Sequence, residues 1–214
     1  MTSIRASRQN EIWRCIRRSA RALRRDRRGV AAVEFAMLFP IMLVVFFGTV
    51  EFCAAIAIDR KVTLVARTLS DLTSQQASTV DSAGLTGIFT YGLYIMSSYP
   101  AIPMKGQVSE VYVDSTGKAK IQWTQGATYS NSTVTLSSST RNVGDDVTSV
   151  VPTALLVTKT YLIFSEVSYQ YLPIGGGYVM AKTGINLNDV SYTRPRQNTC
   201  ITYNGLPAGS CPLT

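Results

Sequence analysis

The chain has 214 residues, enough for one domain with a modest core, and a formal net charge of +8. The whole excess lies in residues 1–28, which hold ten arginines and two acidic residues, while the other 11 basic and 11 acidic residues balance. A globular nucleic-acid-binding domain carries its positive charge on its folded surface, so this distribution argues against nucleic acid as a partner.

The residue types that most catalytic and metal sites need are missing or scattered. Histidine, a common general base and metal ligand, is absent, and Cys15, Cys53, Cys200 and Cys211 lack metal-ligand spacing. The glycines at 175–177 are not followed by the Lys-Ser/Thr of a phosphate-binding loop. We therefore predict that the chain is not an enzyme and has no catalytic residue, no cofactor and no metal.

Residues 30–58 form a long apolar stretch whose only charged residues are Glu34 and Glu51. At about 1.5 Å per residue, a helix of this length exceeds the ~30 Å hydrocarbon core, which predicts a transmembrane helix. Pro40 removes one backbone hydrogen bond and is expected to kink that helix. Because basic residues precede the stretch, we expect a cytoplasmic N-terminus and an extracytoplasmic C-terminal part.

Two other interpretations of the apolar stretch stay open. A cleaved secretory signal peptide could end near residues 55–57, but a secretory apolar region has only about 7–15 residues, roughly half the length of this one. An uncleaved signal segment could instead anchor a periplasmic domain.

The two carboxylates in the apolar stretch differ in expected depth. At mid-bilayer a carboxylate costs roughly 2.5–3.5 kcal/mol, and less near the interface, so Glu34 needs a partner or a shallow position one turn into the helix. Glu51 follows 17 residues later, roughly 25 Å along the helix, which places it near the far interface.

The helix is predicted to continue beyond the membrane, because apolar residues keep helical spacing as far as Leu72. We expect it to end near residue 76, and we expect Asp81 to cap a second helix over about 82–96. The remaining elements are predicted as strands 107–114 and 118–124 in a hairpin, a long polar loop or irregular hairpin over 125–146, a short helix over 145–152, and strands 158–171 and 188–194. The predicted fold class is α+β, with a helical spine on a small antiparallel sheet.

The pairing of the last two cysteines depends on the compartment in which the C-terminal region folds. Cys200 and Cys211 could form a disulfide if the C-terminal region faces an oxidising compartment, and would otherwise be free thiols. In the loop-entropy model such a closure stabilises the fold by about 3 kcal/mol.

The junction R-R-D-R-R-G-V-A-A-V-E-F, from Arg24 to Phe35, resembles a prepilin processing site. It has a glycine before an apolar helix and a glutamate as the fifth residue after that glycine. The longer stretch to Arg67 resembles the TadE-like family of tight-adherence (Tad/Flp) pilus pseudopilins, including its second Glu51-Phe52 pair. Weaker similarity lies at 169–174 and 192–196.

The resemblance implies that a prepilin peptidase cuts between Gly29 and Val30 at the cytoplasmic face. Residues 1–29 would be a removable leader, 30–58 the membrane helix, and 77–214 a pilin-like periplasmic domain. By analogy with pilins, Glu34 would pair with the new α-amine of Val30 in a neighbouring subunit and so set the register between helices.

The implied function is that of a minor pseudopilin in Tad-type pilus assembly, supporting surface adhesion and biofilm formation. Its implied partners are the inner membrane, the prepilin peptidase, other pilins or pseudopilins and the Tad assembly platform. The alternative is a signal-anchored periplasmic binding or adhesion domain that is neither processed nor polymerised.

Overall fold

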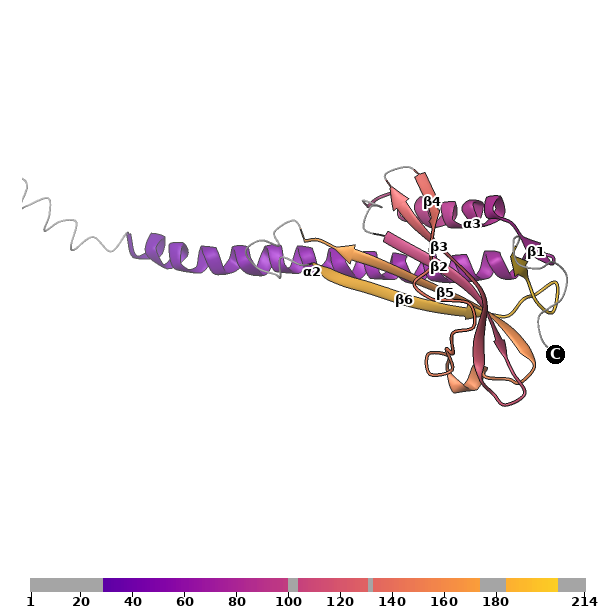
Figure 1. The fold of residues 1–214 in the computed structure, drawn as a ribbon. Helices are drawn as coiled ribbons and strands as arrows, with labels where there is room; N and C mark the ends of the chain where they lie inside the picture. Colours follow the sequence, from indigo (N-terminus) through magenta and orange to yellow (C-terminus); the bar gives the residue numbers. More distant parts are fainter. Residues whose placement is uncertain (1–28, 100–103, 131–132, 174–183, 204–214) are drawn as a thin grey trace, which may run out of the picture. The chain divides into compact units, whose positions relative to one another are not determined.

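The structure is a computed structural model that describes residues 29–99, 104–130, 133–173 and 184–203 (Figure 1). It divides into two units, Met1–Val50 and Glu51–Thr214. The elements in chain order are α2 (Val30–Ser74), β1 (Thr79–Val80), α3 (Ser82–Ile95), β2 (Met104–Val113), β3 (Ala119–Ser130), β4 (Thr133–Ser137), the 3-10 helix η2 (Thr153–Leu155), β5 (Thr160–Tyr171), β6 (Ile185–Thr193) and β7 (Thr202–Tyr203). The predicted α+β class is confirmed.

Helix α2 confirms the predicted long helix and ends two residues before the predicted position. In the first unit its side chains from Val30 to Val50 are exposed, apart from the half-buried Gly48, and Pro40 does not end the helix. In the second unit the helix buries one face, on which Val62, Val65, Ala66 and Leu69 are fully inaccessible to solvent. The helical spacing noted in the sequence therefore marks this buried face.

The sheet contains five antiparallel strands in the order β4-β3-β2-β5-β6, with β2 at its centre and β3 and β5 on either side of it. The predicted β2–β3 hairpin is confirmed, and the Asp114 amide donates to the Lys118 carbonyl across its turn at 2.9 Å. Gly117 in that turn has a φ of 83°, a left-handed conformation that favours glycine.

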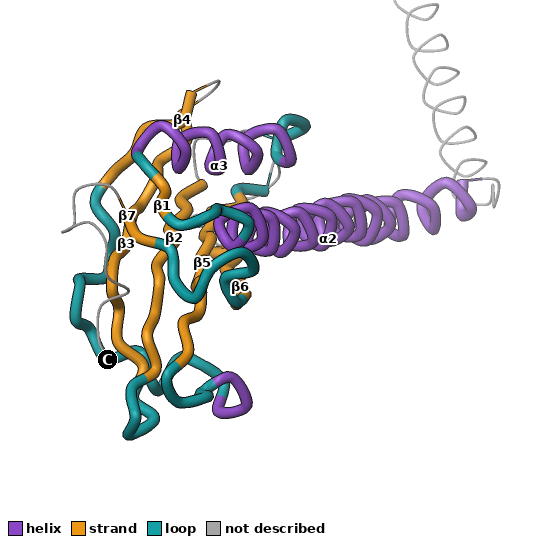
Figure 2. Tube along the Cα trace, turned by 90° about the vertical axis from the view of Figure 1, so that its right-hand side faces the viewer, coloured by secondary structure: helices purple, strands orange, loops and turns teal. Residues whose placement is uncertain are grey.

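Both helices of the second unit lie on the same face of the sheet (Figure 2). Helix α3 begins as predicted, with the Asp81 side chain accepting a hydrogen bond from the Gly84 amide at 2.7 Å. Gly92 allows α3 to pack closely, because a Cβ there would lie 2.9 Å from the Tyr129 hydroxyl and 3.1 Å from Val65 Cγ1. The main core therefore lies between α2, α3 and the sheet.

The segment after β3 differs in part from prediction. Of the two alternatives for residues 125–146, the hairpin is correct as far as Ser137, because β3 runs to Ser130 and pairs with β4. The short helix predicted over 145–152 is wrong. Those residues form turns, because the Val147 amide donates to the Ala119 carbonyl of β3 at 2.8 Å and the Asp145 carbonyl accepts from the Ile121 amide at 3.1 Å.

A short segment near the C-terminus packs on the helix-covered side of the sheet. β7 pairs in parallel with β1 over two residues, and the sequence did not predict this pair. The Ile201 amide donates to Glu110 Oε1 at 2.6 Å, and the Ile201 carbonyl accepts from Trp123 Nε1 at 2.6 Å. Glu110 is completely buried, and this burial raises the pKa of its carboxyl group to about 8 although Ile201 and Trp123 act in the opposite direction.

Glu110 makes the stability of the second unit depend on pH. Its pKa is higher in the folded than in the unfolded chain, so the folded chain binds more protons between about pH 4.5 and pH 8. The free energy of unfolding should fall as the pH rises through that window, by about 1.4 kcal/mol for each pH unit within it. Glu110→Gln keeps an oxygen acceptor for Ile201 and removes the titration, so its pH dependence should be flatter.

Urea denaturation of the detergent-solubilised chain, followed by tryptophan fluorescence at several pH values, measures this difference. The wild type and Glu110→Gln should have similar stability near the lower end of the window, where both side chains are neutral. Parallel curves for the two proteins across the window would contradict the assigned role of Glu110.

Candidate processing and assembly site

The predicted cleavage junction lies where α2 begins. Gly29 immediately precedes the helix, and Val30 is its first residue and is exposed. A Cβ placed on Gly29 would have no atom within 4 Å. The packing of the described residues therefore does not require glycine at position 29, and close approach of a protease backbone is a physical reason for a glycine there.

Glu34 lies on α2 one turn after Val30, and its side chain is exposed. Residues four apart occupy the same face of a helix, so the carboxylate of Glu34 lies on the side of α2 that carries Val30. An exposed carboxylate next to the helix start can meet a cation on another molecule. The structure contains a single chain, so the predicted pairing with a neighbouring subunit stays a prediction.

The stretch between Val30 and Val50 has an apolar surface. Within the described residues, α2 is the one helix long and apolar enough to cross a membrane, and its most apolar segment is not buried inside the protein. A helix packed in a soluble core would be mostly buried, so this surface is consistent with a single-pass membrane anchor.

The two residues of the second family pair, Glu51 and Phe52, lie in different environments. Glu51 is half-buried, and its Oε2 accepts a hydrogen bond from the Tyr171 hydroxyl at 2.6 Å. Phe52 is 61% exposed. Tyr171 is the last residue of β5, so this bond ties the start of the second unit to the end of a central strand.

The environment of Tyr171 keeps it a hydrogen-bond donor. Burial first, and then the hydrogen bond to Glu51 and the charge of that carboxylate, raise the pKa of Tyr171 to about 12. The hydroxyl is therefore protonated at neutral pH and can donate to Glu51. Hydrogen bonds to charged acceptors are among the stronger ones in proteins.

Further along α2, polar contacts fix the helix against the sheet. The Ser165 hydroxyl of β5 donates to the Ala66 carbonyl at 2.6 Å, and the Thr193 hydroxyl of β6 donates to the Ser70 carbonyl at 2.9 Å. Arg196 forms an ion pair with Asp71. The rotation and register of this half of α2 are therefore set by bonds to two strands as well as by core packing.

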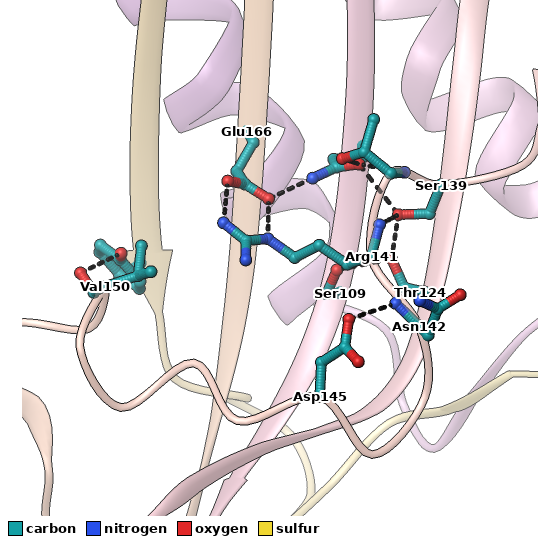
Figure 3. A network of polar contacts seen from close by, with 11 residues as sticks. Ser109, Thr124, Ser139, Arg141, Asn142, Asp145, Val150 and Glu166 are labelled. Carbon is teal, nitrogen blue, oxygen red and sulfur yellow. Dashed lines mark hydrogen bonds and ion pairs between the residues drawn. The ribbon is translucent and has the colours of Figure 1, made fainter.

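The other face of the sheet carries a polar network centred on Glu166 (Figure 3). Arg141 donates to both carboxylate oxygens of Glu166, each at 2.6 Å, and Gln107 also donates to this carboxylate. The Gln107 carbonyl oxygen in turn accepts from the Thr140 amide and hydroxyl at 3.0 and 2.8 Å. These bonds hold the segment after β4 on the sheet, so we assign this carboxylate a structural role.

A groove of about 330 Å³ lies beside this network. Its lining is small or polar for the most part and comes from all five strands of the sheet and from the segment after β4: Lys105, Gly106, Gln107, Gly126, Ala127, Thr128, Ser137, Ser138, Thr140, Glu166, Val167, Ser168, Asn188, Asp189 and Val190. Glu166 is bound by Arg141, and Asp189 accepts from the neighbouring Val190 amide. Across the described parts of the chain, no cluster of three or more His, Cys, Asp or Glu residues could hold a metal.

The cysteines are only partly described. Cys200 is buried, whereas Cys53 is a free and exposed thiol. Cys211 lies outside the described residues, as do the glycines at 175–177. The predicted Cys200–Cys211 pairing therefore stays a prediction.

Comparison with known protein families finds one match. Residues 29–69 match the family model described as TadE-like protein, which confirms the resemblance seen in the sequence over that segment. The matched segment begins at Gly29 and includes Val30, Glu34, Glu51 and Phe52. No curated protein and no solved structure gave a significant match. The match is consistent with a TadE-like protein of the Tad pilus system.

Sequence resemblance singled out Glu51 as a family residue but did not predict its hydrogen bond to Tyr171. Tyr171 belongs to the stretch 169–174, whose similarity to the family pattern was visible, but 120 residues separate it from Glu51. A carboxylate at the end of an apolar run and a tyrosine at the end of a strand were the available signals. Only the fold brings them together.

Tyr171→Phe tests the contribution of this bond to stability. It removes the hydroxyl donor from Glu51 and should lower the free energy of unfolding by about 1–2 kcal/mol, since bonds to charged groups contribute about 1.5–3 kcal/mol and Glu51 is only half-buried. Tyr91→Phe, at an exposed tyrosine on α3, is the matched control and should change stability by less than about 0.5 kcal/mol. Urea denaturation in detergent measures both, and equal effects in the two variants would refute the assignment.

Proposed function

We propose that this chain, whose residues 29–69 are TadE-like, is a minor pseudopilin that takes part in assembly of a Tad-type pilus and so supports adhesion and biofilm formation. The observation that carries the proposal is the layout of α2. An exposed Gly29–Val30 junction, a carboxylate one turn later and an apolar exposed segment follow one another on the same helix. The rest of that helix is the spine of a folded α+β unit.

The first step is proteolytic removal of residues 1–29 by a prepilin peptidase at the cytoplasmic face. Water adds across the Gly29–Val30 peptide bond, leaving a carboxylate on Gly29 and an ammonium group on Val30. The exposure of both residues supports access to this bond. The arginines of the leader favour a cytoplasmic position for the junction, and cleavage removes the excess positive charge of the chain.

The second step is entry of the processed helix into a bundle of other pilins or pseudopilins on the Tad assembly platform. In an apolar bundle an unpaired ammonium and an unpaired carboxylate are each costly. Pairing the Val30 ammonium of one subunit with Glu34 of its neighbour removes both penalties and fixes the axial register. Because the uncleaved chain has no such ammonium, processing would control assembly.

The membrane orientation completes the proposal. The N-terminus lies in the cytoplasm, one helix crosses the inner membrane, and the second unit folds in the periplasm. We further propose that Cys200 and Cys211 form a disulfide in this unit, because disulfides persist in oxidising compartments such as the periplasm.

Processing can be tested by intact-mass analysis of the chain co-expressed with the prepilin peptidase of its host. The processed protein should begin at Val30, and Gly29→Leu should stay at full length because the larger side chain blocks approach of the enzyme backbone. Gly48→Leu is the matched control, since a Cβ at Gly48 also meets nothing within 4 Å, and it should be cleaved normally. A native chain that keeps Met1 would favour the unprocessed, signal-anchored alternative.

The role of Glu34 can be tested separately in the host. Glu34→Gln should insert and be cleaved normally, but surface piliation should fall by about tenfold or more, because losing ~1.4 kcal/mol at a subunit contact changes an association constant tenfold. Glu34→Asp, which keeps the charge on a shorter side chain, should restore part of the assembly. Wild-type piliation in Glu34→Gln would refute the pairing.

A further inference from the structure

We propose that one end of the unit Glu51–Thr214 lies in the outer headgroup layer of the membrane and contacts lipid directly. The contact surface consists of four exposed apolar side chains, which we call the apolar end: Phe52, Ile56, Leu172 and Ile185. This inference rests on the proposed function in one respect, namely that Val30–Val50 crosses the membrane.

The members of the apolar end come from two distant parts of the chain, and Glu51 links them. Tyr171 donates its hydroxyl to Glu51, and Leu172 is the next residue. Ile185 is the direct partner of Tyr171 in the β5–β6 ladder. Phe52 adjoins Glu51, and Ile56 lies one helical turn beyond Phe52. The end of the β5–β6 pair and this turn of α2 therefore lie at the same end of the unit.

All four side chains are exposed in part, Ile56 to 40% and Ile185 to 38%. Phe52 is 61% exposed and Leu172 is 59% exposed. Single exposed apolar residues are common on soluble proteins, but several together indicate a contact surface for a partner or a membrane. Removing apolar surface from water is favourable by roughly 25 cal/mol per Å², so a lipid contact would stabilise this end.

Helix length favours lipid as the occupant of this surface. The 21 residues from Val30 to Val50 span about 31 Å as a helix, which matches the ~30 Å hydrocarbon core. Glu51 then lies where the core gives way to headgroups. The next charged residues on α2, Asp59 and Arg60, come about 12 Å further along, beyond a headgroup layer of roughly 5–7 Å.

The chemistry of the apolar end suits that layer. Tyr171 has an apolar ring and a polar tip bound to a carboxylate, and tyrosines are enriched at membrane–water interfaces. The opposite end of the sheet is different, because exposed charged residues gather near the β2–β3 turn and around the start of β5, among them Lys118, Lys120, Asp146 and Lys159. This difference in polarity between the two ends of one unit is expected if only one of them meets lipid.

Photocrosslinking of the full chain in phosphatidylethanolamine–phosphatidylglycerol vesicles tests the inference. A benzophenone amino acid is introduced in turn at Leu172, at Val143 and at Phe46, and phospholipid adducts are quantified by mass spectrometry. Val143 is the matched control, because it is 58% exposed and lies in the segment that contacts Ile121 near the β2–β3 turn. Phe46 reports whether the membrane segment is inserted.

We expect lipid adducts at positions 46 and 172 and several-fold fewer at 143. Adducts at 46 together with no more at 172 than at 143 would overturn the inference and leave the proposed function intact. An absence of adducts at 46 would instead show that Val30–Val50 does not insert into the membrane. That result would refute the membrane anchor of the proposed function and also this inference. The Leu172 variant is compared with the wild type only if both unfold at the same urea concentration. If they do not, the benzophenone amino acid is placed at Ile185 instead, and the adducts at 185 are compared with those at 143 and 46 in the same way.

Discussion

A single helix has to satisfy two different surroundings, and the rest of the structure depends on how it does so. From Val30 to Val50, α2 presents large apolar side chains that no described part of the protein covers. From Ile58 to Ser74 the same helix buries a face in the main core. Leaving the first half in water is unfavourable, so the sequence of α2 requires an apolar environment at one end and a folded domain at the other.

The change between these surroundings occurs at Glu51. Glu51 is the first residue of the second unit, and its carboxylate accepts a hydrogen bond from the Tyr171 hydroxyl at 2.6 Å, so the last residue of β5 is tied to the position at which α2 enters its domain. Beyond this point α2 supplies core side chains that the sheet cannot replace. The cleavage proposed at Gly29 lies well before Glu51 and would leave every one of the contacts described for the second unit unchanged.

Local patterns made most of the fold predictable. Helical spacing indicated α2, the Asp81 cap gave the start of α3, and the glycine turn gave the β2–β3 hairpin. The elements that were missed or wrongly predicted depend on contacts between distant residues or are too short to show a pattern. The β1–β7 pair has only two residues in each strand, which is too short for any periodic signal, and the segment predicted as a helix over 145–152 forms turns because its backbone groups pair with β3.

The same distinction holds for the site. Gly29, Val30 and Glu34 are close in sequence, so their arrangement could be inferred from a motif and the pitch of a helix. Tyr171 and the Ile201 contacts with Glu110 and Trp123 depend on residues about 80 to 120 positions apart, and no local pattern joins them. The sequence therefore predicts the proposed processing and assembly residues, whereas the long-range contacts that hold the second unit together come only from the fold.

The central claim is that lipid surrounds the first half of α2 and the sheet covers the second. Hydrogen–deuterium exchange of the full chain in lipid nanodiscs, at increasing urea concentrations, tests it most directly, because exchange reports the local environment of each backbone amide. We expect amides of residues 58–74 to lose protection together with β2 and β5 as the domain unfolds, while those of residues 34–50 stay protected. Loss of protection along the whole of α2 in one transition, or fast exchange in residues 34–50 before urea is added, would contradict the account.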